Sequence, residues 1–131
     1  MDKKLSFHHL ILVALLLLIC DSTGAQDARE DLDRFAGLYG DPASGRQFFV
    51  MPSCEGQLVI GPMWADVAPW WMSSVAELEF TYSDSFTQFE AEFTVSDTGE
   101  VEALEHNLEA VESPMKRAGP VSAEFGECVP P

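Results

Sequence analysis

The sequence predicts a mainly β protein, a small antiparallel β-barrel that follows a short N-terminal helix. Residues 76–82 and 89–95 alternate strictly between apolar side chains and acidic or hydroxyl side chains. A period of two with acids on one side is typical of an antiparallel sheet that is buried on one face and wet on the other. Asp97, Thr98 and Gly99 then form a tight-turn signal, because glycine accepts a positive φ. Consecutive antiparallel strands of this kind can close into a barrel.

The first 25 residues are predicted to be a secretory signal peptide. Two lysines give a charged start, an uninterrupted apolar run occupies residues 10–19, and small residues follow up to Ala25. The apolar run is too short to span a bilayer comfortably. We expect cleavage after Ala25. Residues 26–131 then form one exported domain, secreted or periplasmic, without membrane attachment after the signal is removed.

The chain is strongly acidic, with 22 acidic and 7 basic side chains and a formal net charge of −15. Losing the signal peptide removes two acids, Asp2 and Asp21, and two lysines, so the net charge stays at −15. Such a surface repels anionic lipid and repels nucleic acid, whose recognition requires clustered lysine and arginine. The acidity therefore serves solubility or attracts a cationic partner.

Two cysteines remain after the expected cleavage, Cys54 and Cys128. An even pair in an oxidising compartment predicts a disulfide. It would tether the C-terminal tail and, in the chain-entropy model, stabilise the fold by roughly 4 kcal/mol. The third cysteine, Cys20, lies within the signal peptide. Its lipidation is an alternative, but Ile19 is bulkier than the residue that this modification prefers before the cysteine.

The remaining elements follow in order along the chain. Acids crowd residues 26–35 and favour a short helix, because they complement the positive end of the helix dipole. Residues 46–51 predict a strand, residues 52–56 a turn, and residues 57–60 the second arm of a hairpin. The phenylalanines expected to compete for the barrel interior are Phe48, Phe49, Phe80, Phe89 and Phe93. We therefore expect a largely solid core and at most a shallow mouth.

Residues 101–112 permit two interpretations. Their apolar side chains recur at helical spacing, which locally favours an amphipathic helix. The tight turn just before them instead favours a strand that pairs with residues 89–95. We favour the strand.

Every tryptophan of the chain lies in the segment of residues 61–72. The candidate ligand-binding residues are Trp64, Asp66, Trp70, Trp71 and Met72. Three neighbouring indoles form a stacking platform for a sugar ring or a lipid-like ligand, or they fill a small β core. Trp70 and Trp71 are adjacent and face opposite sides of a strand. At least one of them should therefore look outward or into a rim, as an exposed recognition patch does.

The sequence offers little catalytic chemistry. His106 is the only histidine of the mature chain, and one histidine without a second ligand nearby predicts no metal site. Asp66 lies among aromatic residues, where burial would favour a general acid, although capping the turn before Pro69 is the simpler interpretation. Nucleophile elbows, phosphate-binding loops and dinucleotide fingerprints are absent. We expect neither enzymatic activity nor a cofactor.

Residues 34–40, Arg-Phe-Ala-Gly-Leu-Tyr-Gly, resemble the opening motif of the lipocalin-like accessory domain found behind serine-hydrolase domains of the β-lactamase and penicillin-binding type. Later features resemble that domain in the same order: Gly56-Gln57-Leu58, the aromatic-rich residues 89–95, Asp97-x-Gly99, the valine-led residues 101–104, and Met115-Lys116-Arg117. The resemblance, over residues 32–117, implies an antiparallel meander closed into a barrel and an accessory or binding role. Phe35 departs from the tyrosine common in that family. The catalytic serine and lysine of those enzymes lie in their hydrolase domain, so the resemblance implies no catalytic residue here.

Three functions are consistent with these observations. The leading one is an exported, non-catalytic module that binds a small apolar or aromatic ligand, or a partner protein, through the tryptophan-rich loop. The second is an interaction or inhibitor protein whose negative surface steers it to a basic exported partner. The third is a small acid–base enzyme that uses Asp66 or paired glutamates.

Overall fold

The computed structural model describes residues 31–131 apart from residues 110 and 112. The expected signal peptide, its cleavage site and residues 26–30 lie outside the described residues. Within the part of the chain that is described, no helix has the length and apolar character needed to cross a membrane.

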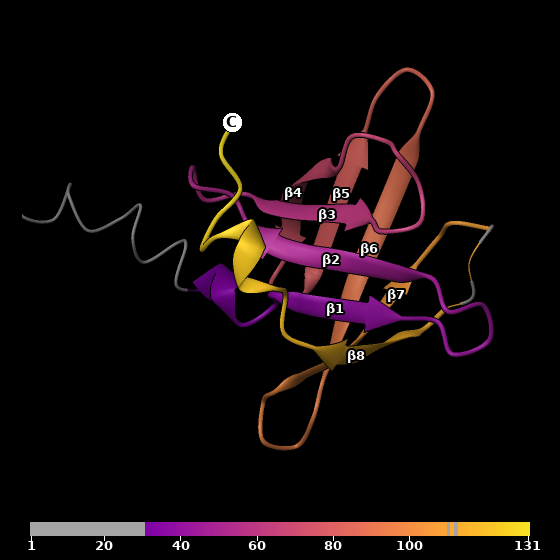
Figure 1. The fold of residues 1–131 in the computed structure, drawn as a ribbon, viewed down its shortest axis with the longest axis vertical. Coiled ribbons are helices and arrows are strands. Elements are labelled where there is room, and N and C mark those ends of the chain that lie inside the picture. Colours follow the sequence, from indigo (N-terminus) through magenta and orange to yellow (C-terminus); the bar gives the residue numbers. More distant parts are fainter. Residues whose placement is uncertain (1–30, 110, 112) are drawn as a thin grey trace, which may run out of the picture.

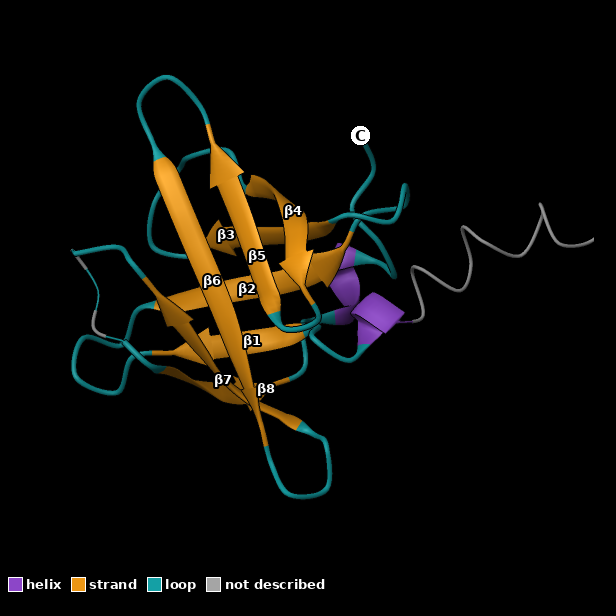
Figure 2. Ribbon diagram, turned by 180° about the vertical axis from the view of Figure 1, so that it is seen from behind, coloured by secondary structure: helices purple, strands orange, loops and turns teal. Residues whose placement is uncertain are grey.

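Eight strands form one closed barrel, in which each strand pairs antiparallel with the next and the last pairs with the first (Figure 1). They are β1 (Gly37–Gly40), β2 (Gln47–Pro52), β3 (Leu58–Pro62), β4 (Trp70–Ala76), β5 (Glu79–Ser83), β6 (Gln88–Val95), β7 (Val101–His106) and β8 (Met115–Gly119). A helical turn at residues 31–33 precedes β1, and a 3-10 helix, η1 (Ala123–Phe125), follows β8 (Figure 2). The predicted fold class, a small antiparallel barrel after a short helix, is confirmed.

β6 and β7 settle the ambiguous segment of the sequence. The residues of β6 alternate between exposed and buried up to Phe93, and only the last two residues of the strand depart from this. The alternation is what the pattern of acids predicted. β7 pairs with β6 from Val101 opposite Val95 to His106 opposite Ala91, so the helical interpretation was wrong for this stretch. Gly99 in the connecting turn has a φ of 86°, the conformation for which glycine was expected.

The alternating segment of residues 76–82 is not one strand. β4 ends at Ala76, residues 77–78 reverse the chain, and β5 begins at Glu79. Leu78 still packs against the core from within the turn, and its carbonyl oxygen accepts a hydrogen bond of 2.9 Å from the Phe93 amide. A period of two is preserved across a two-residue turn, so the pattern by itself could not separate one strand from two.

The barrel interior is filled by side chains. The largest buried side chains that line it are Tyr39, Phe48, Leu58, Ile60, Met72, Phe89, Phe93, Leu104 and Met115. An eight-strand barrel encloses only enough space for its own side chains or one small ligand, and here large aromatic rings occupy that space. The expectation of a solid core is met.

Phe49 corrects one part of that expectation, because it lies outside the barrel. Its neighbours Phe48 and Val50 both belong to the buried core, and successive side chains of a strand point to opposite faces. The Phe49 ring instead stacks on Phe125 of η1, with ring centroids 5.8 Å apart.

Phe35 closes the end of the barrel next to the N-terminal helical turn. Its ring centroid lies 5.3 Å from that of Phe80 and 4.7 Å from that of Phe93. The acid-rich segment before it was expected to be helical, and its described part, residues 31–33, is. The turn thus serves to insert one aromatic side chain into the barrel.

The seam between β7 and β8 has a short register, and a side chain adds a further contact across it. Their register holds only two residue pairs, Ala103 with Lys116 and Leu104 with Met115. Arg117 of β8 donates a hydrogen bond of 3.3 Å to the carbonyl oxygen of Val101 and another to the carbonyl oxygen of Ala36. The guanidinium therefore ties β8 both to β7 and to the chain entering β1.

The expected disulfide joins Cys54 to Cys128 across a sequence separation of 74 residues. Backbone hydrogen bonds accompany it on both sides. The Cys54 amide donates to the carbonyl oxygen of Val129 at 2.9 Å, and the Val129 amide donates to that of Pro52 at 3.0 Å. The bond therefore fastens the C-terminal segment to the end of β2, as the sequence predicted.

Candidate functional site

The two ends of the barrel differ in character. The loops that follow β1, β3, β5 and β7 surround one end, which we call the mouth, and their described residues are 41–46, 63–69, 84–87, 107–109, 111, 113 and 114. The N-terminal helical turn and the disulfide lie at the other end, away from the loops after β1 and β3 (Figure 1). Among the mouth loops that are described in full, the longest is residues 63–69, which belong to the tryptophan-rich segment that the sequence singled out.

Trp64 and Trp70 pack into the mouth on the aromatic core. The ring of Trp64 lies 4.9 Å from that of Phe48, and the ring of Trp70 stacks on Phe89 at 4.6 Å. The Arg46 guanidinium lies 5.7 Å from the Trp64 ring, within the range of a cation–π contact. Both indoles are half-buried. They serve the core and still present a part of their surface at the mouth.

His106 joins the same aromatic group. It lies opposite Ala91 in the register and therefore faces inward, with its ring 5.6 Å from that of Phe48. Its Nδ1 accepts a hydrogen bond of 3.1 Å from the Leu108 amide. The described residues contain no group of three or more potential metal ligands.

The other predicted site residues are not brought together with these indoles. Trp71 lies opposite Val59 and is half-buried on the outside of the barrel, whereas Met72 lies opposite Leu58 and is buried in the core. Asp66 is exposed in the loop. The burial that would favour Asp66 as a general acid is therefore absent.

Three apolar side chains at the mouth face solvent. Phe86 is 96% exposed, Val67 56% and Met63 47%. We call these three residues the apolar rim. The sequence did not single out Phe86 as a site residue, because a phenylalanine next to a strand usually belongs to the core. The available signal was Asp84, an aspartate two residues earlier that could form a turn with the Phe86 amide.

The turn that carries Phe86 is held by a dense set of hydrogen bonds. Asp84 Oδ1 accepts from the amides of Phe86 and Thr87 at 2.8 and 2.7 Å, and Asp84 Oδ2 accepts from the Tyr82 hydroxyl at 2.8 Å. These hydrogen bonds lower the pKa of the Asp84 carboxyl. The bond from the Phe86 amide has the largest effect, and those from Tyr82 and Thr87 come next. Phe86 is thus exposed by a defined local structure.

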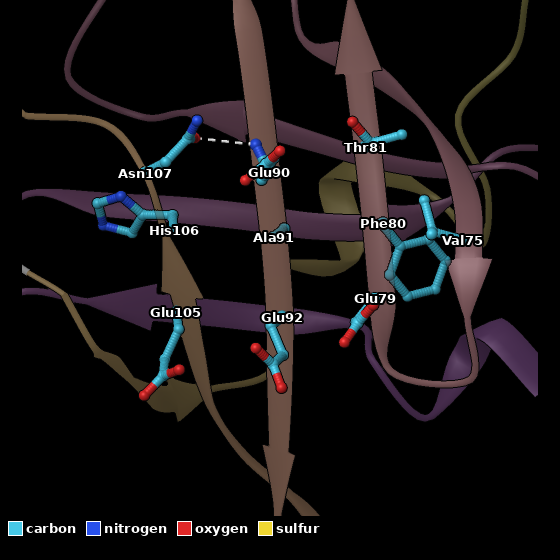
Figure 3. Close-up of a pocket in the computed structure, with 10 residues that line it drawn as sticks. All are labelled: Val75, Glu79, Phe80, Thr81, Glu90, Ala91, Glu92, Glu105, His106 and Asn107. Carbon is cyan, nitrogen blue, oxygen red and sulfur yellow. Dashed lines mark hydrogen bonds between the residues drawn. The ribbon is translucent and has the colours of Figure 1, made fainter.

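An acidic wall covers the outside of β5, β6 and β7 (Figure 3). Glu79, Glu92 and Glu105 lie directly opposite one another on the three strands, and all three are exposed. Glu90 lies one position further along the same face of β6, where its amide donates a hydrogen bond of 2.9 Å to Asn107. These residues line a hollow of about 500 Å³. We use the name acidic wall for these four glutamates.

Comparisons with protein-family models, with curated proteins and with solved structures find no match to this chain. What is shown is thus a closed eight-strand antiparallel barrel with a solid interior, an apolar rim and an acidic wall. The likeness to an accessory domain of serine hydrolases stays an expectation from the sequence.

Proposed function

We propose that the protein is an exported, non-catalytic binding protein that recognises another exported protein through its apolar rim. The observation that carries this proposal is Phe86, a phenylalanine 96% exposed on a turn that Asp84 and Tyr82 hold in place. Leaving a large aromatic side chain in water forgoes about 1.5–3 kcal/mol of burial, which a partner surface can recover. Aromatic anchors of this kind carry much of the energy of protein interfaces.

The filled interior favours a partner protein over a small ligand inside the barrel. Phe48 and Phe89 close the space below the mouth, and Trp64 and Trp70 pack directly on them. A small apolar molecule would have to displace these rings, whereas a protein surface can contact the rim without moving them. The tryptophans then form the floor of the interface, with the rim around it.

Charge supplies a second property of the partner. Three of the four glutamates of the acidic wall, Glu79, Glu90 and Glu92, lie on the hairpin of β5 and β6, the same hairpin whose turn presents Phe86. A partner that accepts Phe86 in an apolar pocket flanked by lysine or arginine would complement both features. Charge complementarity of this kind mainly accelerates association and weakens with salt.

The Cys54–Cys128 disulfide supports the exported location, because such bonds persist in oxidising compartments. Export follows otherwise from the predicted signal peptide. The inhibitor role considered from the sequence is one form of the same proposal, in which the contacted partner is an enzyme.

A photo-crosslinking amino acid placed at position 86 tests the proposal. Position 95 is the matched control, because Val95 is also exposed and apolar but lies where β6 ends, at the far end from the mouth. We expect one exported protein to be captured from position 86 and not from position 95. The purified partner should then bind the Phe86→Ser variant about 10–100-fold more weakly than the unchanged protein. Equal capture from both positions, or equal affinity for both proteins, would contradict the proposal.

A further inference from the structure

The outer face of β2 and β3 is apolar, in contrast to the acidic outer face of β6. Phe49 and Met51 of β2 point away from the core, and Val59 of β3 lies directly opposite Met51. Yet Met51 is only 3% exposed and Val59 is 0% exposed. Val59 lies between Met51 and the half-buried Trp71, its neighbours on the two adjacent strands. Met51, at the outer face of β2, lies against a further segment of the chain.

The covering segment is the C-terminal one, residues 120–131, which we call the strap. It crosses the outside of the barrel beside β2, where its yellow trace is seen in Figure 1. Phe125 stacks on Phe49, and Val129 forms a parallel bridge with Ser53. A groove between the strap and the barrel is lined by Met51 and Pro52 on one side and by Val121 and Gly126 on the other.

The strap buries none of its own side chains fully. Each of its residues is exposed or half-buried, and none is buried. Segments with few buried apolar contacts open locally at a small cost in free energy. The strap is nevertheless held at both ends, by β8 at Gly119 and by the bond from Cys128 to Cys54. Cys54 is exposed, so a small thiol can reach the disulfide.

We propose that the Cys54–Cys128 disulfide makes residues 120–131 a reducible strap, and that opening the bond with a dithiol uncovers the apolar face of Phe49 and Met51. In the chemical step one thiolate of the dithiol attacks a sulfur of the bond, and its second thiol completes the exchange. The dithiol becomes a cyclic disulfide and gives up two electrons and two protons. Cys54 and Cys128 receive them and become free thiols. The barrel stays closed, because its eight strands and its core do not include the strap.

The methionines of the described chain report separately on the strap and on the core. Met51 lies under the strap, Met63 is exposed at the mouth, and Met72 and Met115 are buried in the core. Peroxide oxidises methionine according to its exposure. A variant with both Cys54→Ser and Cys128→Ser mimics the opened strap without thiols that peroxide could oxidise again.

The experiment compares the oxidation rate of each methionine, by peptide mass spectrometry, in the unchanged protein and in the double serine variant. We expect Met51 to be oxidised at least about tenfold faster in the variant, with Met63 equally fast in both proteins and Met72 and Met115 protected in both. The unchanged protein, reduced with dithiothreitol and alkylated, should behave as the variant does.

Two results would overturn the proposal. Continued protection of Met51 in the variant would mean that the strap stays in place without the bond. Oxidation of Met72 and Met115 together with Met51 would mean that the disulfide holds the whole barrel and not the strap alone.

Discussion

The hydroxyl of Tyr39 donates a hydrogen bond of 2.7 Å to the carbonyl oxygen of Phe35. Tyr39 is fully buried, and its burial raises the pKa of the phenol to about 12, although the positive charge of Arg117 opposes the shift. The bond holds the chain that inserts Phe35 into the barrel end. The first motif of the sequence thus closes one end of the fold with two aromatic side chains.

The raised pKa of Tyr39 predicts a loss of stability in alkali. In the unfolded chain the phenol ionises near pH 10, whereas in the folded protein it keeps its proton to about pH 12. Between these values the unfolded state binds fewer protons, so the free energy of unfolding falls as the pH rises, by about 1.4 kcal/mol per unit. Urea unfolding at pH 8, 10 and 11 measures this slope. Tyr39→Phe removes the titrating group, and a slope that persists in this variant would assign the effect to other residues.

The Tyr39→Phe variant should also be less stable near neutral pH. It leaves the carbonyl oxygen of Phe35 without its hydrogen bond in a buried place, which costs about 1–3 kcal/mol. Urea unfolding at pH 7 measures the loss. Tyr82→Phe is the matched control, because the Tyr82 hydroxyl bonds only to the exposed Asp84 and should cost clearly less. Equal losses in the two variants would contradict the structural role of the Tyr39 bond.

Gly61 is required by a close approach of the Phe49 ring. A Cβ atom at position 61 would lie 2.3 Å from Phe49 Cε1, too close for any relaxed side chain. We expect Gly61→Ala to destabilise the protein by about 1–3 kcal/mol, as overpacking does, and to push Phe49 away from Phe125. Gly40→Ala is the control, since the nearest atom to a Cβ there is Gln47 Cγ at 3.5 Å. Thermal unfolding of both variants checks the difference, and equal midpoints would contradict it.

The row of Glu79, Glu92 and Glu105 places three like charges directly opposite one another. Opposed like charges on neighbouring strands are destabilising. We expect Glu92→Gln to raise the free energy of unfolding by about 0.2–1 kcal/mol at low salt, with a smaller gain at high salt because the repulsion is screened. Glu124→Gln, an exposed change outside the row, should have little effect. A gain that does not depend on salt would exclude repulsion as its cause.

The Asp84 turn should govern recognition. Asp84→Ala removes the acceptor for the Phe86 and Thr87 amides, so we expect faster hydrogen exchange at both amides and weaker binding of the partner. Hydrogen bonds to the ionised carboxylate lower the pKa of Asp84. The turn is therefore formed at pH values above the usual pKa range of a carboxyl group, and it is lost as the pH falls through the lowered pKa. Amide exchange by NMR reports the change. Unaltered exchange in the variant would mean that other contacts hold the turn.

The fold was accessible from the sequence because its strongest signals are local. Acids alternate with phenylalanines along β6, and a glycine with a φ of 86° follows it, so the hairpin with β7 could be predicted from neighbouring residues. The pair of cysteines left after the expected signal cleavage likewise predicted the disulfide. The same local reasoning missed the turn at residues 77–78, because a two-residue turn preserves the alternation of its flanking strands.

The sequence by itself determined the hairpin of residues 89–95 with the strand that follows, the dry and wet faces of β6, and the covalent tie between Cys54 and Cys128. Only the tertiary structure decided which aromatic side chains are shared between core and surface. Trp64 and Trp70 lie on Phe48 and Phe89, whereas Phe49 leaves the interior for Phe125 and Phe86 stands in water. The physical reason is that burial depends on which distant segment covers a side chain, and the closing of the barrel and the path of the strap are set by contacts far apart in the chain.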